Sequence, residues 1–157
     1  MIPERPGPHR SRARPRGVAT LEFVITLPLL MLLILATAEV GRALFQYNTL
    51  TKALRDSARY VSGARPGSTG VFNLTPEISA NAQRLVVYGN AAGAGPTLLP
   101  DLALSDITVA NSGAGYVTVS AVYNFTPMLG AQLETFGVVD PIQLAFPMRA
   151  AVVMRVL

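Results

Sequence analysis

The stretch GVATLEF (residues 17–23) places a carboxylate, Glu22, at the start of a long apolar run. The run continues to Ala38 and is interrupted only by Thr26, Pro28 and Thr37. A helix rises about 1.5 Å per residue, so residues 18–38 would extend about 30 Å, which matches the hydrocarbon core of a bilayer. The sequence therefore predicts that residues 18–38 cross a membrane.

Glu22 would lie one helical turn inside that span. A charged side chain there costs less than the roughly 2.5–3.5 kcal/mol assigned to a helix centre, but it is still rarely placed without a role. If the chain were cut after Gly17, the new ammonium group of Val18 would lie one turn before Glu22. The cut would therefore bring a cation to the acid at the helix N-terminus.

The order of motifs along this part of the chain resembles a known bacterial signal. The chain begins with an arginine-rich leader that ends at Gly17, and Glu22 is the fifth residue after that glycine, at the start of a long apolar helix. This order resembles the class III signal of type IV prepilins and pseudopilins. The continuation through LPLL (27–30), EVGR (39–42) and RDSARY (55–60) resembles the TadE-like family, the minor pseudopilins of the tight-adherence (Flp) pilus system. Val18 departs from the phenylalanine or methionine that often begins mature type IV pilins.

This resemblance implies a role in assembling or initiating an adhesive type IV pilus. A prepilin peptidase would cut between Gly17 and Val18, and Glu22 would neutralise the N-terminal ammonium of a neighbouring subunit. The implied partners are that peptidase, major and minor pilin subunits, the inner-membrane assembly platform and membrane lipid. Arg55 and Arg59 resemble the family's basic helical pair, for which helix docking and an ordinary solvated face both remain open.

The charge distribution predicts the orientation in the membrane. The leader, residues 1–17, holds five arginines against Glu4 and so carries the whole net charge of +4. Positive charge marks the cytoplasmic flank of a span, so we expect an inner-membrane protein with a cytoplasmic N-terminus and a periplasmic head. Residues 18–157 have no net charge, which argues against a nucleic-acid partner. The same leader could also act as a nonspecific tail for anionic lipid.

Two other fates of the N-terminal segment stay open. Ala36-Thr37-Ala38 fits the small-residue pattern before a conventional signal-peptidase cut, which would release a soluble binding domain starting at Glu39. Against this, Glu22 would interrupt the apolar region without purpose, and the helical pattern continues through the cut. An uncleaved single-pass protein of a pilus or secretion apparatus is the other alternative.

The helical pattern continues beyond the span through residues 39–62. Apolar residues recur at steps of three and four and predict one buried face, formed by Ala43, Tyr47, Leu50, Leu54, Ala58 and Val61. The opposite face carries Arg42, Lys52, Arg55, Asp56 and Arg59. Glu39 and Arg42 are placed to pair at the outer boundary of the membrane. Pro28 is expected to loosen or kink the helix.

Residues 63–157 are predicted to form an α+β head. A linker at 63–70 precedes a helix over 75–88, with Thr75 as N-cap, Pro76 in the first turn and Gly89 as the stop. After a loop over 90–100, strands are predicted at 106–111, 116–125 and 142–156. Pro147 indicates an edge position or a bulge in the last strand. The expected fold is pilin-like: a long N-terminal helix carrying a small antiparallel sheet and one helix.

The residues needed for common catalytic chemistry are missing from this sequence. The one histidine, His9, lies in the leader, and there is no cysteine, so an enzyme is disfavoured. Asp101 and Asp106 lack the dense pattern of a calcium loop, and we interpret them as loop acids. The glycine-rich residues 89–95 lack the lysine of a phosphate loop. We expect no metal and no cofactor.

Overall fold

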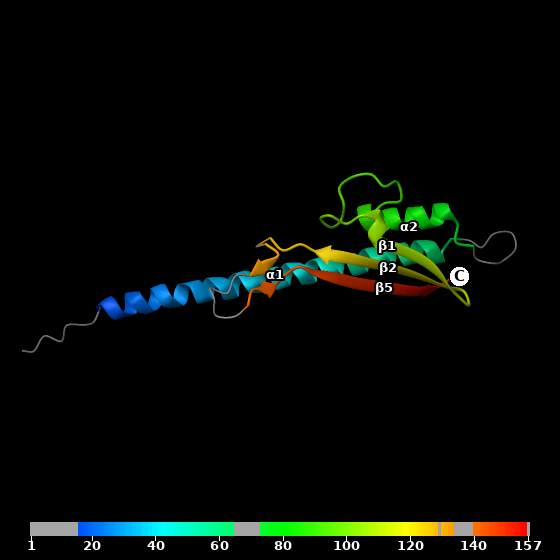
Figure 1. The fold of residues 1–157 in the computed structure, drawn as a ribbon. Coiled ribbons are helices and arrows are strands. Elements are labelled where there is room, and N and C mark those ends of the chain that lie inside the picture. The colour runs from blue at the N-terminus through cyan, green and yellow to red at the C-terminus, as the bar shows by residue number, and fades with distance from the viewer. Residues whose placement is uncertain (1–15, 65–72, 129, 134–139, 157) are drawn as a thin grey trace, which may run out of the picture. The chain divides into compact units, whose positions relative to one another are not determined.

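The structure is a computed structural model that describes residues 16–64, 73–128, 130–133 and 140–156. The chain forms two compact units, Met1–Thr37 and Ala38–Leu157, which are described one after the other. Most of the predicted leader and most of the predicted linker lie outside the described residues. Helix α1, Arg16–Ser62, begins in the first unit and continues in the second (Figure 1).

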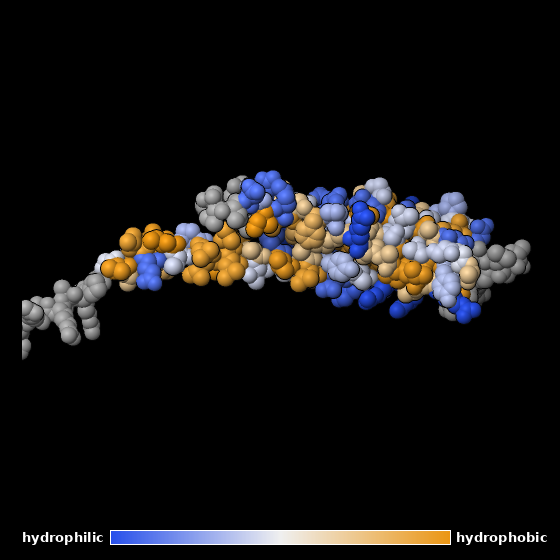
Figure 2. All heavy atoms as spheres, turned by 60° about the horizontal axis from the view of Figure 1, so that its bottom comes forward, coloured by the Kyte–Doolittle hydropathy of each residue, from blue (hydrophilic) through white to orange (hydrophobic). Residues whose placement is uncertain are grey.

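The first unit is the apolar beginning of α1. Large apolar side chains are exposed all round it, including Leu21, Ile25, Leu29 and Leu33, each with more than half of its surface accessible. The hydroxyls of Thr26 and Thr37 donate to the carbonyls of Glu22 and Leu33, at 2.9 and 2.8 Å. Figure 2 shows apolar atoms predominating on the visible face of this segment. The segment is long and apolar enough to cross a membrane, although a signal sequence meets the same criterion.

Pro28 lies inside α1, and the helix is assigned without a break through it. The proline ring removes one backbone hydrogen bond, a loss that membrane helices tolerate when other groups compensate. The predicted loosening is therefore not accompanied by an interruption of the helix.

In the second unit, α1 buries one face against the head. Its fully buried positions are Leu50, Leu54, Ser57, Ala58 and Val61. The prediction for Tyr47 was wrong, because its side chain is 42% exposed and Gln46 takes the buried position instead. A helix face that includes Ala43 and Leu50 passes through residue 46 and not through residue 47.

Helix α2, Pro76–Tyr88, begins and ends as the local sequence predicts. The Thr75 side chain accepts a hydrogen bond from the amide of Ile78, and Gly89 ends the helix in the left-handed conformation with φ of 73°. Glycine adopts this conformation without the steric penalty of a Cβ. The buried hydroxyl of Ser57 on α1 donates to the carbonyl of Ala82 at 2.8 Å, which ties the two helices together.

The main sheet is antiparallel, with strand order β1-β2-β5. Strand β1 is Ile107–Gly113, β2 is Tyr116–Phe125 and β5 is Phe146–Arg155, and the short 3-10 helix η1, Leu104–Asp106, precedes β1. β2 alternates as predicted, with Val117, Val119, Ala121, Tyr123 and Phe125 buried on one face. Pro147 lies on edge strand β5, in agreement with the prediction.

The third predicted strand, 142–156, was wrong in its first part. Residues Ile142–Gln143 form a separate strand, β4, which pairs with β3, Gln132–Leu133, in a two-stranded sheet. Only from Phe146 onward does the chain pair with β2. Strand β3 falls between the predicted strands 116–125 and 142–156, where the sequence predicted no strand, because a pair of residues carries no readable alternation.

The core lies between the covered face of the sheet and the two helices. Both α1 and α2 contribute to one cluster with β2, joined by Ile107 and Met148 from the neighbouring strands. The loop before η1 adds Leu99 and Leu102, both nearly inaccessible. The fold is thus α+β, as predicted, with the helices on one face of a three-stranded sheet.

We predict that Leu54→Ala lowers the free energy of unfolding of the head by about 2–5 kcal/mol, because it leaves a cavity in this core. Leu44→Ala is the matched control on the same helix, since Leu44 is 59% exposed and Leu54 is 0% exposed. Denaturant unfolding of the detergent-solubilised chain measures both. Equal losses for the two variants would contradict the described core.

Candidate functional site

The predicted processing site lies in the first turn of α1. Gly17 and Val18 are both exposed, and Val18 is 63% accessible. A Cβ built on Gly17 would meet nothing within 4 Å, so packing within the chain does not require glycine at this position. Glycine also weakens a helix by about 1 kcal/mol relative to alanine, which favours local opening of this turn.

Glu22 lies one turn after Val18 on the exposed surface of the same helix. Its carbonyl accepts the hydroxyl of Thr26, while its side chain points outward from a helix that is apolar on both sides of it. In lipid, this carboxylate has a strong preference for a cation. The position therefore suits an ion pair with an amino terminus at Val18, within the chain or on a neighbouring subunit.

Arg55 and Arg59 lie one turn apart on the exposed side of α1. The carbonyl of Arg59 accepts hydrogen bonds from the amide of Gly63 and the hydroxyl of Ser62, so the backbone here closes the helix. Both guanidinium groups are on the side of α1 that the sheet leaves uncovered. The arrangement is compatible with docking and equally with a solvated face.

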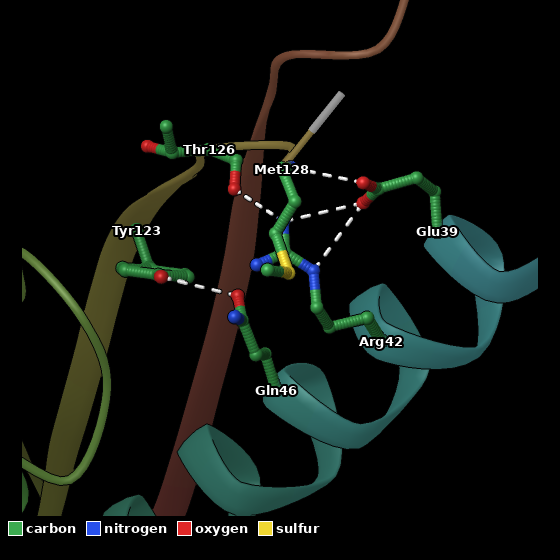
Figure 3. Close-up of polar contacts among 6 residues, drawn as sticks. All are labelled: Glu39, Arg42, Gln46, Tyr123, Thr126 and Met128. Carbon is green, nitrogen blue, oxygen red and sulfur yellow. Dashed lines mark hydrogen bonds and ion pairs between the residues drawn. The ribbon is translucent and has the colours of Figure 1, made fainter. Parts of the chain in front are cut away.

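A polar cluster joins α1 to the end of β2 (Figure 3). Glu39 and Arg42 form an ion pair, with Nη2 of Arg42 at 3.2 Å from Oε2 of Glu39. The same guanidinium donates to the carbonyl of Thr126 at 2.6 Å, and the amide of Met128 donates to Oε1 of Glu39 at 2.9 Å. The cluster therefore fixes the chain that leaves β2 to the beginning of the head part of α1.

Aromatic rings complete the surroundings of Arg42. Its guanidinium carbon lies 5.0 Å from the centre of the Phe125 ring, at a distance suited to a cation–π contact. Phe125 in turn lies 5.5 Å from the ring of Phe146 on β5. Arg42 is therefore half-buried among head residues, and the prediction that it lies on the face opposite the head was wrong.

Gln46 continues the cluster by one turn. Its Oε1 atom accepts the hydroxyl of Tyr123 from β2 at 3.1 Å, with both side chains buried. Burial raises the pKa of Tyr123, with the negative charge of Asp101 acting in the same direction and Arg42 opposing it. Both the burial and the hydrogen bond to Gln46 favour the neutral phenol.

The sequence predicted the Glu39–Arg42 pair but not its partners in the head. Thr126 and Met128 offer backbone groups, which leave no pattern in the sequence. A usable signal was the spacing of Glu39, Ala43 and Gln46, which places two polar residues on the same face as the buried alanine. A polar residue on a buried face predicts a hydrogen-bonding partner across the core.

These features define a class of protein: an α+β head whose long helix begins with an exposed apolar segment that carries an acid near its start. The sequence model of the TadE-like protein family matches residues 17–59, which confirms the predicted resemblance over this segment. The match includes Gly17, Glu22, the Glu39–Arg42 pair and both arginines, and it ends within α1. No curated protein and no solved structure matches the chain.

We predict that Glu39→Ala lowers the free energy of unfolding of the head by about 2 kcal/mol, because Arg42 loses its ion pair and Met128 loses its acceptor. Asp56→Ala is the control, an exposed acid on the same helix whose loss should change stability by less than about 0.5 kcal/mol. Chemical denaturation followed by circular dichroism gives both values. A Glu39→Ala variant as stable as Asp56→Ala would show that the cluster does not hold the head.

Proposed function

We propose that this chain is a minor pseudopilin of a tight-adherence (Flp-type) pilus, processed by a prepilin peptidase and required for assembling or initiating the pilus. The observation that carries the proposal is the TadE-like match, which begins at Gly17 and includes Glu22 within one continuous helix. A structural subunit also agrees with a sequence whose one histidine, His9, precedes the proposed cut and which has no cysteine.

The proposed cut between Gly17 and Val18 changes the electrostatics of the helix start. Removal of the leader takes away five arginines and creates one ammonium group at Val18. That ammonium lies about one helical turn from Glu22, where a pair of opposite charges compensates part of the cost of placing either charge in lipid. Processing thus converts an anchored precursor with a basic cytoplasmic tail into a subunit whose N-terminus is close to neutral.

In this proposal residues 18–38 span the inner membrane and the head lies in the periplasm. The basic leader supports the orientation, because positive charge stays on the cytoplasmic side. The proposed partners are the peptidase at Gly17, pilin subunits at Glu22 and the assembly platform in the membrane. Arg55 and Arg59 are available on the uncovered side of α1 for an acidic surface of such a partner.

We predict that Gly17→Leu causes full-length precursor to accumulate in the membrane. A leucine side chain fills the space beside the scissile bond, whereas the chain's own packing tolerates it, since nothing lies within 4 Å of the added Cβ. Immunoblotting with an antibody to the head separates precursor from mature protein by the mass of the leader.

Gly41→Leu is the matched control for this experiment. Gly41 also lies in α1, and a Cβ there likewise meets nothing within 4 Å. The control should mature normally. Normal maturation of Gly17→Leu would overturn the proposed cut, while a loss of both proteins would reveal a general effect on the helix.

For Glu22→Ala we predict normal removal of the leader together with loss of piliation, because the carboxylate acts after the cut by pairing with an ammonium group. Glu77→Ala, an exposed acid in the first turn of α2, should leave both unchanged. Pili are counted by electron microscopy and maturation is followed by immunoblotting. Normal piliation of Glu22→Ala would exclude the neutralising role.

A further inference from the structure

The outward face of α1 carries several large apolar side chains beyond the predicted end of the span, together with the exposed polar residue Asn48. Val40, Leu44, Phe45 and Tyr47 are 61%, 59%, 70% and 42% exposed, although they belong to the head unit and follow Ala38. They lie on the side of the helix that the sheet does not cover. An exposed cluster of large apolar side chains on a folded domain marks a contact surface.

The polar cluster removes charge from this part of the helix. Between Ala38 and Thr51 the sequence has two charged residues, Glu39 and Arg42, and their side chains are only 7% and 27% exposed. Both charges are directed toward the end of β2 (Figure 3). The next charge, Lys52, is exposed and is followed by Arg55, so the outward face turns from apolar to charged at this point.

The threonines in this interval also hide their polar groups. The hydroxyls of Thr49 and Thr51 donate to the carbonyls of Phe45 and Tyr47, at 3.0 and 2.8 Å. Thr26 and Thr37 in the apolar segment make the same bond to the preceding turn. The helix thus handles its hydroxyls alike in both places, in the way that suits surroundings without water.

Met128 adds an apolar side chain from the head itself. It is 79% exposed, and its amide is held by Glu39, which places it beside the beginning of this outward face. The segment after β2 therefore exposes a large apolar side chain at the turn of α1 where the outward face begins.

We propose that Val40, Leu44, Phe45, Tyr47 and Met128 form a membrane-contacting face that seats the head in the interfacial layer of the bilayer. This inference rests on the membrane span of the proposed function. Residue 38 lies at the predicted end of that span, so the residues directly after it along the chain enter the headgroup layer. Measured from Ala38, Val40 and Leu44 rise about 3 and 9 Å and Tyr47 about 13 Å, so the face begins within the roughly 5–8 Å of one interfacial layer and extends past its outer edge. Tyr47, at the far end, combines an apolar ring with a polar hydroxyl, as residues at the membrane–water boundary do.

The absence of cysteine from the sequence makes a direct test possible with single-cysteine variants of the full chain. Phe45→Cys and Met128→Cys carry an environment-sensitive fluorophore on the proposed face. Leu30→Cys reports on the span, and Arg55→Cys reports on the charged part of α1 beyond the face. Each labelled protein is reconstituted into phosphatidylcholine–phosphatidylglycerol vesicles that contain nitroxide lipids, labelled either at the headgroup or within the acyl chain.

We expect headgroup nitroxides to quench the labels at 45 and 128 several-fold more strongly than the label at 55. Acyl-chain nitroxides should quench the label at 30 most strongly. If 45 and 128 are quenched no more than 55 while 30 is quenched, the proposed face is wrong and the span stands. If 30 is not quenched by either lipid, the span fails and the inference fails with it.

A second copy of the chain is the competing occupant of this face. In that case Phe45→Cys, left unlabelled, would form a disulfide between two copies in the vesicles, and the labelled protein would be shielded from nitroxide lipid. That result would overturn the lipid contact.

Discussion

The contact between Glu39 and Arg42 determines how the head joins its helix. Glu39 is nearly inaccessible, and it holds both a guanidinium from its own helix and a backbone amide from the segment after β2. Burying either charge alone would cost several kcal/mol, so each requires the other, and both require the carbonyl and amide groups that β2 delivers. These contacts consequently fix the position of the chain that leaves β2 relative to residues 39–42 of α1. Gln46 and Tyr123 repeat the arrangement one turn further on with neutral groups.

One helix serves two different surroundings, and its composition changes accordingly. In the first unit large apolar side chains are exposed on all sides of the helix, and Glu22 is the one carboxylate among them, a composition suited to lipid. In the second unit one side of α1 packs on the sheet, and the other becomes charged from Lys52 onward. Between these regions, the polar cluster turns the two charges toward the head. The proposed membrane-contacting face follows from this, because the outward side carries no charge over that interval and Asn48 is its one exposed amide side chain.

Local chemistry made several elements predictable from the sequence. Thr75, Pro76 and Gly89 bound α2 through interactions within a few residues, and the alternation of β2 identifies its buried face. Interactions distant in sequence were not predictable. Gln46 is buried because Tyr123, 77 residues later, satisfies its carbonyl oxygen, whereas the pattern favoured apolar-looking Tyr47. Strands β3 and β4 were missed because each has only two residues.

The candidate processing residues differ from all of these, since their roles depend on other molecules. Gly17 and Glu22 are exposed and make few contacts that would explain their identity within the chain. Gly17 lowers the stability of the helix although packing does not require a glycine there. Glu22 adds the free-energy cost of a charge in an apolar helix. Folding alone explains neither residue. In the proposed function, one event requires both residues: the cut after Gly17 frees the amino group of Val18, which gives Glu22 a cationic partner.

The most direct test is the intact mass and N-terminal sequence of the protein extracted from its native membrane. A chain beginning at Val18 is the result that the account predicts. A chain that still begins at Met1 would contradict processing and leave an anchored membrane protein. A chain that begins at Glu39 would contradict the span as well, since a conventional signal peptidase would then have released the head.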